Sequence, residues 1–378
     1  MSDGLFGGIY ARGDAAAAVS DAAWLVAMLD VEAALARACA RGGLIPDDAA
    51  EAIAAACARP EALDLEAIGR EAARHATPVV PLVAALREAV AGDAASFVHH
   101  GATSQDIVDT AAMLVASRAL EPLLRDAGAV CDAAARLADE HRATPVQGRT
   151  LMQPARTTSF GLKAAGWLHG VCNARAVLVQ VRDRALAVQM GGPVGARSPA
   201  IAGLVAEDLG LREPVMPWHT DRVHPAMLAG ALGVLAGALA KIAQDVVLLA
   251  QAEVAEVREG GDPGRGQSSA MAHKRNPVAS VSVIACAERV PGLVQTMLAA
   301  MPQEHERAAG RWQAEWGTLS DLLRLTGSAA AWGADLVANL EVDAERMHAN
   351  IVQGDRTVPD AASELIDRAL DAHRGMPS

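Results

Sequence analysis

Apolar residues recur at helical spacing over most of this chain. Between residues 21 and 40, Trp24, Leu25 and Met28 begin a series at the three- and four-residue intervals of one helix face. The pair Gly42-Gly43 ends this helix, and shorter Ala-rich helices follow up to a turn at Gly92. The pattern therefore predicts a small N-terminal helical domain over residues 1–92.

Longer helices dominate the rest of the chain. The apolar-periodic segments cover residues 105–137, 154–190, 225–258, 277–300 and 311–340. A helix of thirty-odd residues is about 45–50 Å long, against a usual mean of about 11–12 residues. Because no alternating strand pattern separates these segments, we expect an all-α fold with a long central helical bundle over residues 93–340. Residues 341–378 are more polar and predict a short, loosely packed C-terminal segment.

Composition agrees with a helical core. The 378 residues are 52% apolar but only 3% aromatic, so the core is built mainly from Ala, Leu and Val. Ala and Leu lead the intrinsic helix scale, whereas aromatic and β-branched residues lead the strand scale. A chain of this length and apolar content can bury a sizeable core, which excludes disordered, collagen-like and small disulfide-stabilised proteins.

The charge balance and the cysteines narrow the class of partner. With 33 Lys and Arg against 45 Asp and Glu, the net charge of −12 argues against nucleic acid or an anionic membrane as the main partner. The five cysteines are scattered and form no C-x-x-C pair, so neither a disulfide framework nor a zinc site is indicated. We interpret them as reduced core residues of a cytoplasmic protein.

No targeting or membrane segment is expected either. The first residues lack the basic and apolar regions of a signal peptide. The most apolar stretch, residues 226–240, is shorter than a membrane span and contains three glycines. It is better interpreted as a helix that is buried on all sides within the bundle.

Three polar segments interrupt the helices, and the first lies at residues 99–106. Thr103 and Asp106 have the spacing of a capping box, so an ordinary helix N-cap is the simpler interpretation. Alternatively, the Thr103 and Ser104 hydroxyls, with the free amides at the helix start, hold a substrate carboxylate.

The second polar segment covers residues 148–155. Pro154 stands where the first residue of a helix favours proline. Gln153 either donates to a substrate oxygen or caps the turn, and taken alone we interpret it as structural.

The third polar segment, residues 260–277, is a glycine-rich loop. From Asp262 to Arg275 it carries one negative and three positive charges in a strongly acidic protein, which is the local focus that an anionic substrate requires. Asn276 and Pro277 also form a good N-cap and first-turn pair, so part of the signal is ordinary helix initiation. A phosphate loop is disfavoured because G-x-x-x-x-G-K-[ST] is absent and no strand pattern precedes the loop.

This loop resembles the mobile-loop motif of the fumarase/aspartase superfamily, which reads close to G-S-S-x-M-P-x-K-x-N. Residues 268–277 read Ser-Ser-Ala-Met-Ala-His-Lys-Arg-Asn-Pro, with Gln267 replacing the glycine and Ala272 the proline. Agreement with the cycloisomerases of this superfamily extends to His99-x-Gly101-Ala102-Thr103-Ser104-Gln105-Asp106, Pro217-Trp218-His219-Thr220, 301–307 and 312–316. The resemblance covers residues 5–350, and several motifs in the same order are more specific than any one of them.

The resemblance implies an intramolecular lyase that closes 3-carboxy-cis,cis-muconate to 4-carboxymuconolactone in protocatechuate breakdown. The substrate is a small anionic tricarboxylate, and neither a metal nor another cofactor is required. The enzyme is expected to be a homotetramer whose active sites combine the three segments from different subunits.

Residue roles follow from the same resemblance. Ser268 handles a proton next to a carboxylate, and Lys274, Asn276 and the Thr103/Ser104 helix start stabilise the carbanion intermediate. His99 is expected to contact the substrate, although a lone histidine is more often structural. Gln153, Ser269 and Arg222 are further substrate-binding candidates, Arg222 because a guanidinium grips a carboxylate bidentately.

Two departures leave alternatives open. Many superfamily lyases carry a catalytic histidine where this chain has Leu151, which counts against a fumarate-releasing lyase of the adenylosuccinate or argininosuccinate type. The family's C-terminal helical domain is expected to be truncated here, over residues 341–378. A catalytically silent structural homologue is the remaining alternative, and the presence of Ser268, Lys274 and Asn276 together argues against it.

Overall fold

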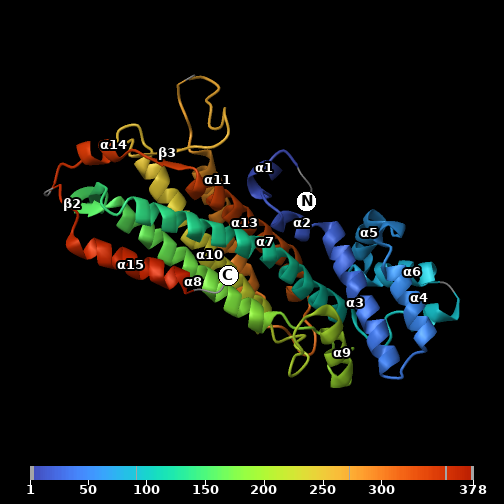
Figure 1. Cartoon of the computed structure of the whole chain (residues 1–378). Helices are drawn as coiled ribbons and strands as arrows, with labels where there is room; N and C mark the ends of the chain where they lie inside the picture. The colour runs from blue at the N-terminus through green and yellow to red at the C-terminus, as the bar shows by residue number, and fades with distance from the viewer. Residues whose placement is uncertain (1–3, 91, 272, 354–355, 376–378) are drawn as a thin grey trace.

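The computed structural model describes residues 4–90, 92–271, 273–353 and 356–375. Over these residues the protein is mainly helical, with two small two-stranded antiparallel sheets. The predicted all-α class is therefore confirmed, and the long helices lie side by side in one elongated bundle (Figure 1).

The N-terminal helices gather at one end of the molecule (Figure 1). The predicted helix at residues 21–40 is confirmed as α3 (Asp21–Arg41). Ser20 caps this helix by accepting a hydrogen bond from the Ala23 amide. It packs against its neighbours α4 (Asp47–Cys57) and α5 (Leu65–His75) and also against the central helix α7 (Ser104–Glu140). The division at residue 92 therefore remains a proposal. The helices of this end are α1 (Gly7–Tyr10), α2 (Ala15–Ala18), α3 (Asp21–Arg41), α4 (Asp47–Cys57), α5 (Leu65–His75) and α6 (Val79–Val90).

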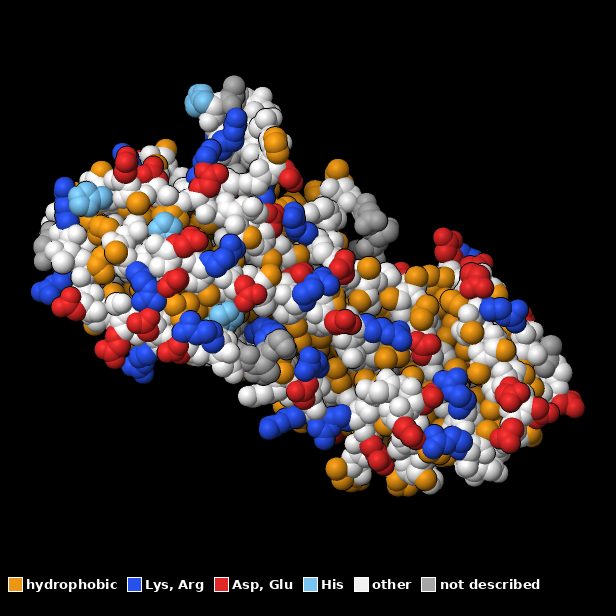
Figure 2. All heavy atoms as spheres, in the orientation of Figure 1, with side chains coloured by type: hydrophobic (Ala, Val, Ile, Leu, Met, Phe, Trp, Pro, Cys, Tyr) orange, Lys and Arg blue, Asp and Glu red, His pale blue; other side chains and the backbone are white. Residues whose placement is uncertain are grey.

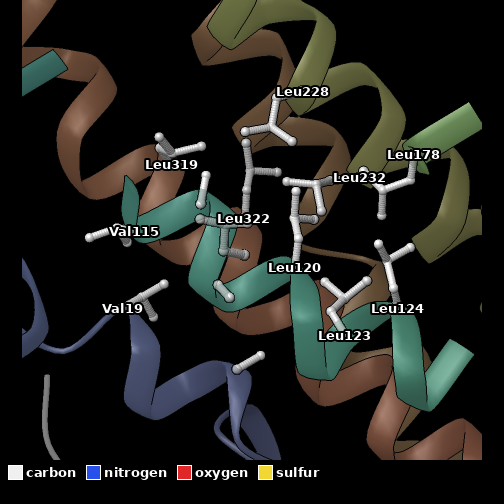
Figure 3. Close-up of a cluster of buried hydrophobic side chains, with 14 of the residues drawn as sticks. Val19, Val115, Leu120, Leu123, Leu124, Leu178, Leu228, Leu232, Leu319 and Leu322 are labelled. Atoms are coloured by element: carbon white, nitrogen blue, oxygen red, sulfur yellow. The ribbon is translucent and has the colours of Figure 1, made fainter. Parts of the chain in front are cut away.

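Long helices form the central bundle. The helix α7 packs along α8 and α13, and α10 packs against α8, α11 and α13. Leucines from α7, α8, α10 and α13 pack together, among them Leu123, Leu178, Leu232 and Leu322 (Figure 3). The bundle helices are α7 (Ser104–Glu140), α8 (Phe160–Ala185), α10 (Val223–Leu249), α11 (Val278–Ala287), α12 (Val290–Ala299) and α13 (Arg311–Ala338), and α9 (Pro199–Leu209) lies against α3.

The predicted helix over 154–190 begins six residues late, at Phe160. Residues 153–159 instead form β2 (Gln153–Ser159), which pairs with β1 (Pro145–Thr150) in a hairpin. The β-branched residues Thr157 and Thr158 favour the strand, and Pro154 lies near the hairpin turn, where a missing amide donor costs little. The helix then starts with Ser159 as its N-cap, which accepts from the Leu162 amide.

Two other predicted helices end or break early. The helix expected over 225–258 stops at Leu249, and β3 (Val257–Glu259) pairs with β4 (Leu340–Val342). The helix expected over 277–300 is divided into α11 and α12, and Pro291 lies in the first turn of α12, where proline is tolerated.

The expectation of a loosely packed C-terminal segment is wrong. The helices α14 (Ala344–Ala349) and α15 (Asp360–Arg374) follow β4, and α15 lies along α8 and α7. Its buried residues Ala362, Ile366 and Leu370 recur every four positions on one face. The polar residues between them obscured this amphipathic pattern.

The most apolar stretch, residues 226–240, lies within the longer helix α10. By length and composition alone, α10 and the stretch 278–299 could each cross a membrane, and 56% and 39% of their most apolar windows are buried. The helix α10 contacts α8, α11, α12 and α13, but Val223, Met227 and Val234 stay exposed, so the expectation that it is buried on all sides is wrong for the single chain.

Candidate active site

The three polar segments lie at two opposite ends of the bundle. Thr103 precedes α7 and the β1–β2 hairpin follows it, so the 37 residues of α7 separate them by about 55 Å. The third polar segment, residues 260–277, is called the serine loop. It begins near the C-terminal end of α13, where the Gly260 amide donates to the Asn339 carbonyl. The first segment adjoins the other end of α13, so within one chain it lies far from the loop.

At the first segment, a buried carboxylate orients His99. The Nδ1 atom of His99 lies 2.6 Å from Oε1 of Glu32 on α3, whose side chain is fully buried. An ionised carboxylate only accepts hydrogen bonds, so Nδ1 carries the proton and Nε2 is the nitrogen left for a ligand. His99 also has a φ of 63°, which few non-glycine residues adopt.

Two arginines flank the start of α7. Nη1 of Arg307 donates to Thr103 Oγ1 at 2.6 Å, and its Nη2 donates to the Pro193 carbonyl. Arg197 donates to the His100 carbonyl on the other side. With the positive end of the α7 dipole, these guanidinium groups make a setting suited to a carboxylate beside Thr103 and Ser104.

Asp106, in the first turn of α7, holds this region together. Its carboxylate accepts hydrogen bonds from the Gly191 and Gly192 amides at 2.8 Å each, from His219 at 2.9 Å and from the Thr103 amide at 3.1 Å. Burial by itself would raise the pKa of Asp106, but the hydrogen bonds from His219 and Gly191 lower it below its ordinary value. The capping interpretation therefore holds for Asp106, which anchors two distant loops to the helix start.

Arg222 does not fit the role that the sequence suggested. Its guanidinium is buried and donates to both carboxylate oxygens of Asp109 and to both of Glu315. Burial opposes its charge, yet these two carboxylates raise the pKa of Arg222 above its ordinary value. No free donor edge remains for a substrate carboxylate, so Arg222 is a structural cation that ties α10 to α7 and α13.

The second segment, residues 148–155, contains an exposed two-residue hairpin turn at its middle. Leu151 and Met152 both have positive φ, as a tight hairpin turn requires, and their side chains are 96% and 68% exposed. Gln153 follows the turn, pairs with Thr150 and is exposed. Arg149 in β1 forms a bidentate ion pair with Glu256 just before β3. This pair places the hairpin at the same end of the molecule as the serine loop.

The serine loop projects from the body of the molecule (Figure 2). The Gly266 carbonyl accepts from both the amide and the side chain of Asn276, at 2.8 and 3.2 Å, and closes the neck of the loop. Ser268 Oγ accepts from the Ala270 and Met271 amides at 3.3 and 3.2 Å. Ser269 and Lys274 are exposed, and position 272 lies outside the described residues.

Comparison with known proteins places the chain in a family. A family model described as lyase matches residues 12–292, about three quarters of the chain. The nitrosuccinate lyase of Streptomyces davaonensis is 45% identical over 93% of this chain and 77% of its own length. The 3-carboxy-cis,cis-muconate cycloisomerase of Pseudomonas aeruginosa is 44% identical over 92% of this chain and 77% of its own.

This chain belongs to the lyase family.

Solved structures agree with this membership. The 3-carboxy-cis,cis-muconate lactonizing enzyme of Pseudomonas putida superposes with a TM-score of 0.87 and 38% identity, over 98% of this chain and 88% of that one. A fumarate lyase from Mesorhizobium superposes with a TM-score of 0.82 and 30% identity, over 95% of this chain and 85% of that one. The resemblance to the fumarase/aspartase superfamily is thus confirmed.

Sequence reasoning missed three residues that contact the first segment. Glu32 is the single charged residue between Asp30 and Arg37, and an isolated acid within an apolar helix was a usable signal. Arg307 stands within the motif at 301–307 but attracted no separate attention. Arg197 follows a glycine-rich stretch, and only the fold brings it to His100.

Proposed function

We propose that this lyase-family protein is a cycloisomerase that closes 3-carboxy-cis,cis-muconate to 4-carboxymuconolactone. Support comes from cycloisomerases of three bacteria at 40–44% identity, and from two solved lactonizing enzymes with TM-scores of 0.87 and 0.86. The observation that carries the proposal is the pairing of a cationic helix start with a separate serine loop. It suits a substrate with several carboxylates and one proton to transfer.

The first segment would bind a substrate carboxylate. The Thr103 and Ser104 hydroxyls and the α7 amides lie at the helix start, where the Arg307 guanidinium donates to Thr103, and His99 precedes them on the same segment. When another substrate carboxylate adds across its own double bond, a C–O bond forms and the π electrons move toward the neighbouring carboxyl group. Fixed positive groups stabilise that developing charge without reorganising.

Ser268 would handle the proton on the neighbouring carbon. A serine is a weak acid and base, but its oxygen here accepts from the amides of Ala270 and Met271. Two such donors stabilise negative charge on the oxygen, which eases proton transfer through it. Lys274 follows on the same loop and adds a positive charge, and Asn276 closes the neck of the loop. We keep Gln153 and Ser269 as substrate-binding candidates.

Each active site would combine several copies of the chain in a homotetramer. One copy holds the first segment and the serine loop at opposite ends of α13, a 28-residue helix of about 42 Å. An exposed stripe on α10 offers a surface for association, since Val223, Met227 and Val234 are 41–54% exposed and lie on one face with Gly230 and Gly237. Glycines on that face let another helix approach closely.

A second candidate is elimination of nitrite from nitrosuccinate. It is favoured by the 45% identity with the Streptomyces nitrosuccinate lyase. The two reactions share their demand on the protein, because both pass through negative charge delocalised next to a carboxylate. In the cycloisomerase reaction, the carboxylate that bonds to carbon belongs to the substrate itself. In the nitrosuccinate reaction, the nitro group leaves the carbon as a separate nitrite ion.

A substrate panel separates these functions. We expect purified protein to remove the conjugated-diene absorbance of 3-carboxy-cis,cis-muconate, with kcat/KM at least about tenfold above that for unsubstituted muconate, because the extra carboxylate meets a cation. Parallel reactions measure nitrite from nitrosuccinate and fumarate from adenylosuccinate and argininosuccinate. Leu151 at the hairpin tip predicts no fumarate from the last two.

The same panel can contradict the proposal. Nitrite release with no loss of diene absorbance would assign the second function instead. Ser268→Ala is expected to lower kcat by about 10²–10⁴-fold, the usual range for a proton-transfer group. An unchanged rate in that variant would remove Ser268 from the mechanism, and inactivity of the wild type on the whole panel would favour the silent structural homologue.

A further inference from the structure

Two cysteines meet between the central helices, away from all three polar segments. Cys131 on α7 and Cys172 on α8 are buried, and their Sγ atoms lie 2.9 Å apart. The other three cysteines are also free and buried, and within the described residues none of them forms a hydrogen bond with another cysteine. Only this pair is placed for chemistry between two sulfur atoms.

A histidine from the C-terminal helix faces the same pair. Nδ1 of His373 on α15 lies 3.6 Å from Cys172 Sγ, and its Nε2 lies 3.0 Å from Asp132 Oδ1. The Asp132 carboxylate orients the ring, so that Nδ1 faces the Cys172 sulfur. Cys172, His373 and Asp132 thus form a line of thiol, imidazole and carboxylate drawn from three helices.

The electrostatics distinguish Cys172 from the remaining cysteines. Its hydrogen bond with Cys131, and then His373, lower the pKa of the Cys172 thiol, whereas the hydrogen bond with Cys172 raises that of Cys131. Burial raises the pKa of Cys57 to about 12 and also raises those of Cys39 and Cys286. Because His373 contacts the sulfur of Cys172, we take Cys172 as the attacking sulfur of the pair.

Access to the pair runs past the last turn of α15. His373 is one residue from the end of that helix, and its side chain is 23% exposed. Helix ends open at low free-energy cost, so a small reagent can reach the sulfurs without unfolding of the bundle. A disulfide bond is about 2.05 Å long, so the sulfurs need to approach by less than about 1 Å.

We propose that Cys131 and Cys172 form a redox-modification site at which a hydroperoxide produces a disulfide between α7 and α8. The Cys172 thiolate attacks one peroxide oxygen, the O–O bond breaks, and the departing oxygen takes a proton from His373 or water. Cys131 then attacks the sulfenic sulfur, and the S–O bond breaks. The leaving hydroxide takes the Cys131 proton and departs as water. The two sulfurs lose two electrons, which the peroxide gains.

The test uses the whole wild-type protein and hydrogen peroxide in slight excess. We expect peptide mass spectrometry to find Cys131 linked to Cys172 as the main product, with two thiols lost and both recovered after dithiothreitol. In Cys131→Ser the sulfenic acid on Cys172 should persist and react with dimedone. His373→Gln should slow disulfide formation by about tenfold, because the Cys172 sulfur loses its imidazole partner.

Two controls keep the proposal falsifiable. Cys57→Ser should leave the reaction unchanged, and circular dichroism during oxidation should show that the protein stays folded. Oxidation of Cys39, Cys57 or Cys286 as fast as the pair, or linkage only after unfolding, would overturn the proposal. An unchanged rate in His373→Gln would remove the histidine from it.

Discussion

Backbone strain concentrates in the motif segments of this lyase. Six non-glycine residues in the described ranges have positive φ, and four of them lie in motif segments: His99, Leu151, Met152 and His305. Such conformations cost about 1–3 kcal/mol each and persist only where the surroundings impose them. At His99 the imposing contact is the hydrogen bond to buried Glu32, so a residue outside every motif positions one inside.

That contact yields a prediction for Glu32. Glu32→Gln keeps an oxygen that can accept from His99 Nδ1, so we expect kcat/KM to fall only about tenfold through the loss of charge. Glu32→Leu removes the acceptor and should cost about 100-fold, since the imidazole loses both its orientation and its fixed proton. Steady-state kinetics over pH 6–9 measure both variants.

The order of the two variants is the decisive result. Glu51→Gln, an exposed substitution on α4, is the matched control and should leave kcat/KM unchanged. If both Glu32 variants keep wild-type kinetics, Glu32 has no positioning role. If both lose activity only in step with thermal stability, its role is confined to folding.

At the scale of elements, α7 gathers the parts of the first segment around its N-terminus. Asp106 joins this turn to the 191–192 loop and to His219, as Arg222 joins α7 to α10 and α13. Both are buried charges whose partners come from distant parts of the sequence. Removing one member of such a group leaves the others unpaired, which commonly costs about 3–5 kcal/mol.

The lowered pKa of Asp106 gives a pH-dependent prediction. Since its folded-state pKa lies below the ordinary 3.8, its contribution to stability is complete above that value and disappears as the pH falls through the lower one. Asp106→Asn should therefore lower the free energy of unfolding by about 3–5 kcal/mol at pH 7, and by progressively less below about pH 4.

Denaturant unfolding at matched protein concentration measures this difference, because association also contributes to stability. Asp47→Asn, at an exposed position in the first turn of α4, should change stability by less than about 0.5 kcal/mol. A difference for Asp106→Asn that stays constant down to pH 2 would contradict the role of the charged carboxylate.

At the scale of the whole molecule, one copy separates the groups that the reaction needs. The first segment and the serine loop occupy opposite ends of α13, and the hairpin tip exposes Leu151 and Met152. Exposed apolar residues beside a functional segment mark a surface that a partner covers. The proposed tetramer accounts for the stripe on α10 as well as for this tip.

Mixing two inactive variants tests the shared site. Ser268→Ala removes the functional side chain of the serine loop, and His99→Ala removes one from the first segment. Each variant on its own should therefore form a nearly inactive oligomer. After dissociation and reassembly of a mixture, some sites combine an intact loop with an intact first segment, and activity should return. Light scattering gives the oligomeric state of each sample.

The control is the same treatment of each variant alone, which should restore nothing. Recovery in the mixture only would support sites built from several copies. Persistent inactivity of reassembled mixed oligomers would contradict them, as would full activity in a stable monomer.

Local sequence patterns predicted much of this protein. Helical periodicity located α3, α7 and α13 to within a few residues, because their apolar faces repeat over many turns. It failed at Pro154, where hairpin pairing outweighs the helix-start signal, and at α15, whose buried face contributes few residues. Motif spacing brought Ser268 and Thr103 to attention without any knowledge of where they lie.

The helical class, the long bundle and the superfamily follow from the sequence alone, because they depend on local periodicity and on motifs read along the chain. Which side chains meet follows only from the fold. It showed that Arg222 is consumed by Asp109 and Glu315, and that Glu32 orients His99. It also placed the serine loop far from Thr103. These facts depend on contacts between residues distant in sequence, which no local pattern encodes.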